Sequence, residues 1–322
     1  MIYFLFLQLI GLLILVHFIE KVYSLLRGKK KEKNVVTLLE SDTNNKSSIN
    51  INNFNYNHNN NIPQLKARML AIFKSSLVDP PKELNSPASM DSSTNSMLPN
   101  EILHHFLSSD PSNAFSMNFG NDALLAYSPS KKPSVHHGMF CGLDNIYCAF
   151  MGGLNNLSQL IKQYRLSKGS NDAMFTIEAY RTLRDRGPYP ADQVLKELDG
   201  SFAFVIYDDK NGTIFVASDS NGDIGLFWGI AADGSVVISD SKELIKASCA
   251  KSFAPFPSGC MFHSGHGLMS YEHPNRKLKA MPRVDSEGIM CGATFLVDSQ
   301  SRKSIMPRVG SEANWAVWGP QA

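Results

Sequence analysis

The chain has 322 residues, enough for one large domain or two, since about 200 residues already bury a substantial core. Lysine and arginine number 31 and aspartate and glutamate 29, which leaves a formal net charge of +2. A charge so near zero gives no electrostatic footprint for nucleic acid, and we expect no nucleic-acid partner.

Residues 1–26 form a hydrophobic segment. Its apolar run from Ile2 to Ile19 approaches the roughly 20 residues that a membrane helix needs, and basic residues follow the run. Because no basic residue precedes it, the pattern is the reverse of a signal peptide, and an inserted helix would leave the remainder in the cytosol. Two interpretations of residues 1–68 stay open: a lineage-specific anchor, or an untranslated region read as coding.

Residues 27–68 are first basic and then rich in asparagine, with ten Asn between positions 44 and 61. Such a low-complexity tract buries little apolar surface, so we predict a disordered linker. It precedes the predicted domain at 69–298. An irregular tail is predicted at 299–322.

Within the domain, the Ser-, Pro- and Asn-rich stretch up to Ala123 contains one amphipathic helix, at 100–108. After it, the apolar patterns predict a series of strands and helices. The strands are expected at 123–128, 146–152, 201–208, 213–218, 226–230 and 236–239 with a pair within 259–271, and the helices at 155–166, 172–186 and 241–247. After Arg283 the pattern fades.

The clearest local signal is a hairpin. Apolar residues run almost unbroken on both sides of Asp209-Lys210-Asn211-Gly212. Asn-Gly between two such runs is a strong hairpin signal, and the unbroken runs predict two buried strands. The turn also accounts for Asn211, which begins a glycosylation sequon, so we expect no glycan there.

The segment from Leu198 to Trp228 carries the most specific pattern in the chain. It contains Leu198-Asp199-Gly200-Ser201-Phe202-Ala203-Phe204, then Asp219-Ser220-Asn221-Gly222, then Leu226-Phe227-Trp228. This order resembles the N-terminal domain of class II glutamine amidotransferases. The resemblance implies an α+β fold, namely a four-layer αββα sandwich of the N-terminal nucleophile hydrolase type.

A second motif resembles a plant family. Leu183, Arg184, Asp185 and Arg186 form a Leu-Arg-Asp-Arg run like that of the aluminium-induced proteins with YGL and LRDR motifs. The other motif departs, because Tyr164-Arg165-Leu166 has arginine where the family has glycine, the residue that adopts positive φ at a helix end. The LRDR run is either a helix-end anion site or ordinary stabilisation of a helix C-terminus by cations.

The chemistry that the amidotransferase resemblance implies begins with a Cys, Ser or Thr at the mature first residue, activated by its own α-amine. Here Met69 is followed by Leu70, and no cysteine precedes Cys141. Leucine cannot attack a carbonyl. Ser75 and Ser76 would need a cleavage that no motif marks.

Two more parts of the implied site are altered. Met151-Gly152-Gly153-Leu154 matches the oxyanion hole but has methionine in place of the asparagine donor, a loss that typically lowers the rate about 10²- to 10³-fold. No arginine lies between Met69 and Tyr164 to hold the substrate carboxylate.

Asp172 stands where these enzymes bind the substrate amine, but it is also an ordinary first-turn acid. We treat Gly152, Gly153 and Asp172 as a vestigial ligand cleft, with purely structural roles as the alternative.

Five cysteines without any Cys-x-x-Cys pair predict reduced core thiols in a cytoplasmic or nuclear protein, with no cofactor and no metal. In the adjacent pairs His104-His105 and His136-His137, neighbours on a strand would point to opposite faces, so we expect neither pair to share a metal ion. A metal site of His263, His266, His273 and Cys260 is an alternative, and exposed turn residues are the simpler interpretation.

The leading hypothesis is therefore a non-catalytic, glutaminase-like domain that acts as a stress- or hormone-responsive binding or regulatory protein in plants. The first alternative is an amidohydrolase that uses another nucleophile, such as Cys141 or Cys148. The second is a membrane-tethered interaction protein, if residues 1–26 are expressed. The partner is an unidentified protein or small molecule, and a homodimer stays open.

Overall fold

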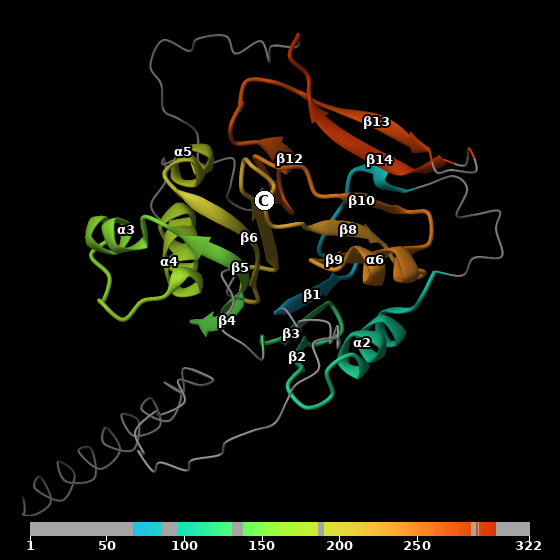
Figure 1. The fold of residues 1–322 in the computed structure, drawn as a ribbon, viewed down its shortest axis with the longest axis horizontal. Helices are drawn as coiled ribbons and strands as arrows, with labels where there is room; N and C mark the ends of the chain where they lie inside the picture. The colour runs from blue at the N-terminus through green and yellow to red at the C-terminus, as the bar shows by residue number, and fades with distance from the viewer. Residues whose placement is uncertain are drawn as a thin grey trace, which may run out of the picture. The chain divides into compact units, whose positions relative to one another are not determined.

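The computed structural model describes residues 67–85, 96–130, 138–185, 190–284, 288 and 290–300 (Figure 1). The predicted segment 1–26 lies outside these residues, as do 27–66 of the predicted linker and 301–322 of the predicted tail. No helix in the described part is both long and apolar enough to cross a membrane.

Two six-stranded sheets form the centre of the domain (Figure 1). The first has the order β10 (Phe253–Pro255), β8 (Phe227–Ile230), β9 (Val236–Ser239), β1 (Arg68–Phe73), β3 (Ala123–Ser128) and β2 (Phe115–Phe119). The second has the order β12 (Gly267–Ser270), β11 (Cys260–His263), β7 (Thr213–Ser218), β6 (Gly200–Asp208), β5 (Ile146–Leu154) and β4 (Gly138–Leu143). All of their strand pairs are antiparallel.

Helices cover the outer face of each sheet. The helices α3 (Leu157–Gln163), α4 (Asp172–Asp185) and α5 (Ala191–Lys196) pack on the second sheet, and α2 (Pro99–Ser108) and α6 (Lys242–Cys249) pack on the first. A short 3-10 helix, η1 (Lys82–Leu84), precedes α2. The predicted four-layer αββα sandwich is confirmed, with one apolar core between the sheets and one beneath each helical layer.

Strand β1 contributes to two of these cores. Met69, Ala71 and Phe73 point between the sheets, whereas Leu70 and Ile72 point towards α2 and α6. Because both faces are buried, the strand is a continuous apolar run without polar alternation. It lies between β3 and β9, far apart in sequence, and so joins the two halves of the domain.

The predicted hairpin is also confirmed. Strands β6 and β7 pair from Ala203–Ser218 to Asp208–Thr213, and all their residues are buried except the partly buried Gly200, Ser201 and Thr213. Gly212 has φ +61°, the left-handed conformation for which the Asn-Gly signal selects.

Most predicted elements are close to their observed bounds. Strands β3, β7 and β9 have the predicted ends, and β5, β6, β8, α2 and α6 differ by one or two residues. Helix α4 ends at Asp185, next to residues that are not described. Helix α3 is shorter than the predicted 155–166, because it begins at Leu157 and its C-cap is Tyr164.

Several elements were not predicted from the sequence, namely β1, β2, β4, β10 and α5. The expectation that the pattern fades after Arg283 was wrong, because β13 (Leu278–Val284) and β14 (Met290–Val297) form a third, two-stranded sheet. The ring of Phe295 lies 5.7 Å from that of Trp228, so this hairpin completes the core between the sheets. Arg283 fixes it by donating to the carbonyls of Phe253 and Cys291, at 2.9 and 3.1 Å.

The end of α3 keeps its turn despite the departure from the Tyr-Gly-Leu motif. Arg165 has φ +57°, so the backbone keeps the conformation that a glycine would favour. The N–H of Leu166 donates to the carbonyl of Ile161 at 2.9 Å, and that of Arg165 to the carbonyl of Lys162 at 3.2 Å. These two bonds define a Schellman motif, in which a residue other than glycine carries strain.

Replacing Arg165 by glycine should therefore stabilise the domain by about 1 kcal/mol, because the strain of a left-handed residue is removed. Chemical denaturation measures the change in the free energy of unfolding. The matched control is Lys162→Gly in the same helix, which should destabilise by about 0.5–1 kcal/mol. A destabilised Arg165→Gly variant would contradict this account of the helix end.

Candidate functional site

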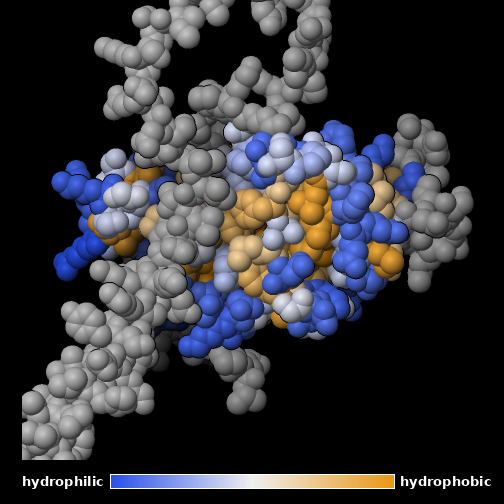
Figure 2. All heavy atoms as spheres, turned by 90° about the horizontal axis from the view of Figure 1, so that it is seen from below, coloured by the Kyte–Doolittle hydropathy of each residue, from blue (hydrophilic) through white to orange (hydrophobic). Residues whose placement is uncertain are grey.

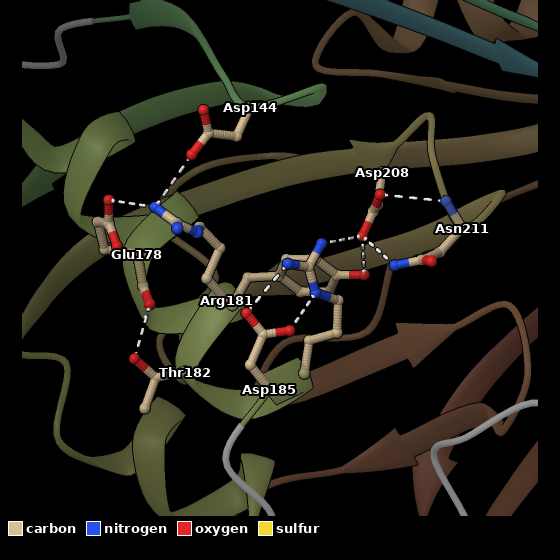
Figure 3. A network of polar contacts seen from close by, with 9 residues as sticks. Asp144, Glu178, Arg181, Thr182, Asp185, Asp208 and Asn211 are labelled. Atoms are coloured by element: carbon tan, nitrogen blue, oxygen red, sulfur yellow. Dashed lines mark hydrogen bonds and ion pairs between the residues drawn. The ribbon is translucent and has the colours of Figure 1, made fainter.

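The LRDR run lies at the end of α4, against the β6–β7 hairpin (Figure 3). The Arg184 Nη1 donates to Asp208 Oδ2 at 2.8 Å, while its Nε and Nη2 donate to the two oxygens of Asp185 at 2.7 and 3.1 Å. The Asp208 side chain is 0% exposed, that of Arg184 is 27% exposed, and that of Asp185 is 51% exposed. The inner of these two ion pairs is therefore the one shielded from water.

Asp208 collects further donors at the same carboxylate. The Tyr180 hydroxyl donates to Oδ2 at 3.2 Å, and Asn211 donates through its backbone N–H to Oδ1 at 3.2 Å and through its side-chain amide to Oδ2 at 2.9 Å. Burial, followed by the charge of Asp208, raises the pKa of Tyr180. One buried carboxylate thus joins the helix, the strand end and the hairpin turn.

Arg181, about one helical turn before Arg184, connects α4 to the β4–β5 turn. Its Nη1 lies 2.9 Å from Glu178 Oε1 and 3.5 Å from Asp144 Oδ2 (Figure 3). Asp144 and Asn145 both have positive φ, as the tight two-residue turn between β4 and β5 requires.

Leu183 is buried beneath the helices, while Arg186 lies outside the described residues. The described LRDR residues therefore hold the fold together, which favours the interpretation of ordinary stabilisation over that of an anion site.

The start of β1 is where the resemblance to the hydrolases implies a nucleophile. Leu70 is fully buried beneath α2 and α6, and the Met69 N–H donates to Asp240 Oδ1 at 2.8 Å. On the inner face, a Cβ built on Gly138 would lie 2.6 Å from Ala67 Cβ, 2.8 Å from the Tyr127 hydroxyl and 3.0 Å from Met151 Sδ. The Ala67 methyl group, the Tyr127 hydroxyl and the Met151 thioether therefore fill the space beside this strand start.

Gly152, Gly153 and Asp172 do come together, at the end of β5. Gly152 has φ +101°, and a side chain there would collide with the carbonyl of Ser201 on β6. A Cβ on Gly153 would meet no heavy atom within 4 Å. Buried Asp172 accepts from the N–H of Leu154 at 2.8 Å, so this carboxylate closes the strand end onto α4. Position 152 therefore requires glycine, because the backbone of β6 lies too close for a side chain. Of these three residues, only Gly153 borders open space.

The histidines of the β11–β12 hairpin do not form a metal site with Cys260. Within the described ranges, no three His, Cys, Asp or Glu side chains are placed to hold a metal ion. The Nδ1 of His263 accepts from the Gly265 N–H at 3.0 Å, and its ring lies 4.8 Å from that of His266. Burial, and then the neighbouring His266, lower the pKa of His263 to about 3. Of the other histidines, His104 and His105 are exposed on α2, and His136 and His137 lie outside the described residues.

A match to the family described as aluminium induced protein covers residues 70–297. The chain belongs to the aluminium-induced protein family. The chain is also similar to the stem-specific protein TSJT1 of Nicotiana tabacum. The two are 38% identical over 149 residues, which are 46% of this chain and 99% of that protein.

More distant proteins share parts of the domain. A probable glutamine-hydrolyzing asparagine synthetase of Dictyostelium discoideum is 41% identical over 85 residues, which are 26% of this chain and 15% of the synthetase. The solved glutamine phosphoribosylpyrophosphate amidotransferase from B. subtilis aligns with 65% of this chain and 50% of its own, at 14% identity and a TM-score of 0.41. The chain therefore spans a small part of the synthetase and half of the amidotransferase.

The sequence analysis missed the structural roles of two buried acids, which lie at opposite ends of the β6–β7 pair. Asp208 appeared only as the end of a strand. Asp219 is equally buried, and accepts from the N–H groups of Phe202 at 3.0 Å and Gly222 at 2.5 Å. An acid at the end of a buried strand, followed by Asn-Gly or Asn-Gly-Asp, was the available signal, because such an acid can cap the following turn.

Removing the Asp208 carboxylate should destabilise the domain strongly. In Asp208→Ala, the donors of Arg184, Tyr180 and Asn211 lose their common acceptor, which should cost roughly 3 kcal/mol. Asp185→Ala is the matched control, since its exposed ion pair should contribute less than about 1 kcal/mol. Urea denaturation of both variants measures the two losses, and equal losses would refute the central role of Asp208.

Acid should weaken the domain through His263. The pKa of His263 is 6.5 in the unfolded chain and about 3 in the folded chain, so the neutral imidazole costs no stability above pH 6.5. Below pH 6.5 the unfolded chain binds the proton first, and the free energy of unfolding falls as the pH drops towards 3, by at most about 1.4 kcal/mol per pH unit. Protonation also removes the Nδ1 acceptor that the Gly265 N–H uses. His263→Gln, which keeps an acceptor and cannot titrate, should show a shallower decline in denaturation midpoints between pH 7 and pH 4. Parallel pH profiles would rule this role out.

Proposed function

We propose that the chain is a non-catalytic member of its family, in which a glutaminase-like sandwich serves as a stress- or hormone-responsive binding or regulatory domain. The observation that carries the proposal is the occupant of the nucleophile position. Leu70 has no group that can attack a carbonyl, and its side chain points into the core beneath α2 and α6, away from the space between the sheets.

The surroundings of that position support the same proposal. The oxyanion-hole position carries Met151, which is buried in the core between the sheets and offers no N–H donor from its side chain. Arg68, the arginine nearest to the strand start, holds its guanidinium 5.2 Å above the ring of Phe106, on the side of α2. It is therefore directed towards the helical layer, and away from any substrate between the sheets.

The relatives support a role that differs from that of the synthetases. The tobacco relative is named for stem-specific occurrence, and the family for induction by aluminium. Glutamine hydrolysis belongs to the printed name of the synthetase, of which this chain covers 15%. Induction by stress or hormone, a protein or small-molecule partner, and a cytoplasmic or nuclear location follow as parts of the proposal, with membrane tethering if residues 1–26 are expressed.

The direct test is incubation of the full-length chain with glutamine. Ammonia release should not exceed that of a heat-denatured sample. Leu70→Cys is an informative companion, because its thiol would face the helical layer and should not restore hydrolysis. Turnover by the unmodified chain would overturn the proposal, while turnover by Leu70→Cys alone would overturn the geometric part of it.

The alternative of a cysteine nucleophile receives no support from the thiols. All five are buried, and burial raises the pKa of Cys141 and Cys148 above the ordinary value. A thiolate, not a thiol, is the attacking species, so a raised pKa slows the reaction.

A thiol-reactive probe should accordingly label the folded chain much more slowly than it labels free cysteine at the same pH. After denaturation all five cysteines should react, which controls for prior oxidation. Mass spectrometry identifies the labelled positions. Rapid labelling of Cys141 or Cys148 in the folded chain would revive the nucleophile hypothesis.

A further inference from the structure

Strand β2 is the edge strand of the first sheet. Among the residues that the structure describes it pairs with β3 alone, so the opposite side of its backbone is an open row of hydrogen-bonding groups. Natural sheets usually protect such an edge with charged residues or proline. The five residues of β2, Phe-Ser-Met-Asn-Phe, include neither.

The same strand carries apolar side chains that are only partly covered. Phe115, Met117 and Phe119 are half-buried, and the cross-strand partner of Met117 is Leu125, a residue of the core between the sheets. The ring of Phe115 lies 5.3 Å from that of Phe140, on the edge strand of the other sheet. Seen from below, the side on which β2 and β4 lie in Figure 1, apolar residues gather across the middle of the coloured surface, with polar residues among them (Figure 2).

The sequence of β2 is complementary to itself. A two-fold axis through Met117 would pair two copies of the strand in antiparallel fashion, with Phe115 opposite Phe119 of the second copy. The aromatic residues would then share one face, and Ser116 and Asn118 the other. Such an isologous contact closes on itself and pairs the β2 edge of both copies, while β10 stays the other edge of each first sheet.

Charge agrees with this register. The nearest acids on either side of β2 are Asp110 and Asp122. Both lie outside the five paired positions 115–119. No carboxylate is among the paired residues, so the pairing itself brings no like-charge repulsion.

We propose that β2 is a homodimer interface, in which two copies of the chain join their first sheets by antiparallel pairing of residues 115–119 about Met117. Pairing supplies the missing partners of the edge backbone and covers the exposed parts of Phe115 and Phe119. The result is a continuous sheet through both copies, with the two LRDR networks in separate subunits.

The register can be tested by cross-linking in the full-length chain. In Met117→Cys, the two thiols would stand directly opposite, with Cβ atoms about 4.5–5.5 Å apart, and diamide would take up two protons and two electrons as the disulfide forms. A covalent dimer should appear on a non-reducing gel. The native cysteines are buried, so they should not compete. Lys246→Cys, exposed on α6, is the matched control and should give no dimer.

Analytical ultracentrifugation tests the interface without cross-linking. The unmodified chain should sediment as a dimer, and Met117→Lys, which places two ammonium groups side by side, should sediment as a monomer with an unchanged circular dichroism spectrum. A monomeric unmodified chain, a Met117→Lys variant that stays dimeric, or failure of Met117→Cys to cross-link would each overturn the proposal. If β2 pairs instead with a strand of another protein, the unmodified chain should sediment as a monomer, and this result would overturn the proposal.

Discussion

A buried negative charge is the constraint on which this domain depends. Asp208 has no exposed side-chain surface, so its carboxylate must be compensated from within the protein. Arg184 supplies the charge, and Tyr180 and Asn211 supply hydrogen bonds. Since these donors come from the helix and from the hairpin turn, the geometry of one carboxylate fixes the outer helical layer against the second sheet.

The layers themselves follow from simple alternation. In β1, successive side chains enter two different cores, and the same holds for β5, where Ala149 and Met151 face the first sheet while Cys148 and Phe150 face α4. A sheet buried on both faces leaves little room for polar chemistry. Leu70 and Met151, at the two positions where the resemblance to the hydrolases implies catalytic groups, are buried in these apolar cores.

Sequence reasoning succeeded where the signal is local. The β6–β7 hairpin and strand β3 could be located because apolar runs and turn residues mark their ends. It failed where the structure is decided by distant partners. Strand β1 is flanked by polar residues in the sequence, and its central place in the sheet depends on pairing with the distant strand β9. Strand β14 is held in place by the contact of Phe295 with Trp228, which is also distant in sequence. The role of Asp208 was hidden for the same reason, since Arg184 lies 24 residues earlier.

The position of β1 has a consequence for synthesis in the cell. This strand is made first among the described elements, yet its sheet partner β9 follows some 165 residues later, and the hairpin that seals Trp228 comes later still. The ribosome must therefore deliver nearly the whole domain before the interior is closed. Until then, the apolar run of β1 is a natural target for chaperones, because long-range sheet pairing is slow and leaves such strands exposed.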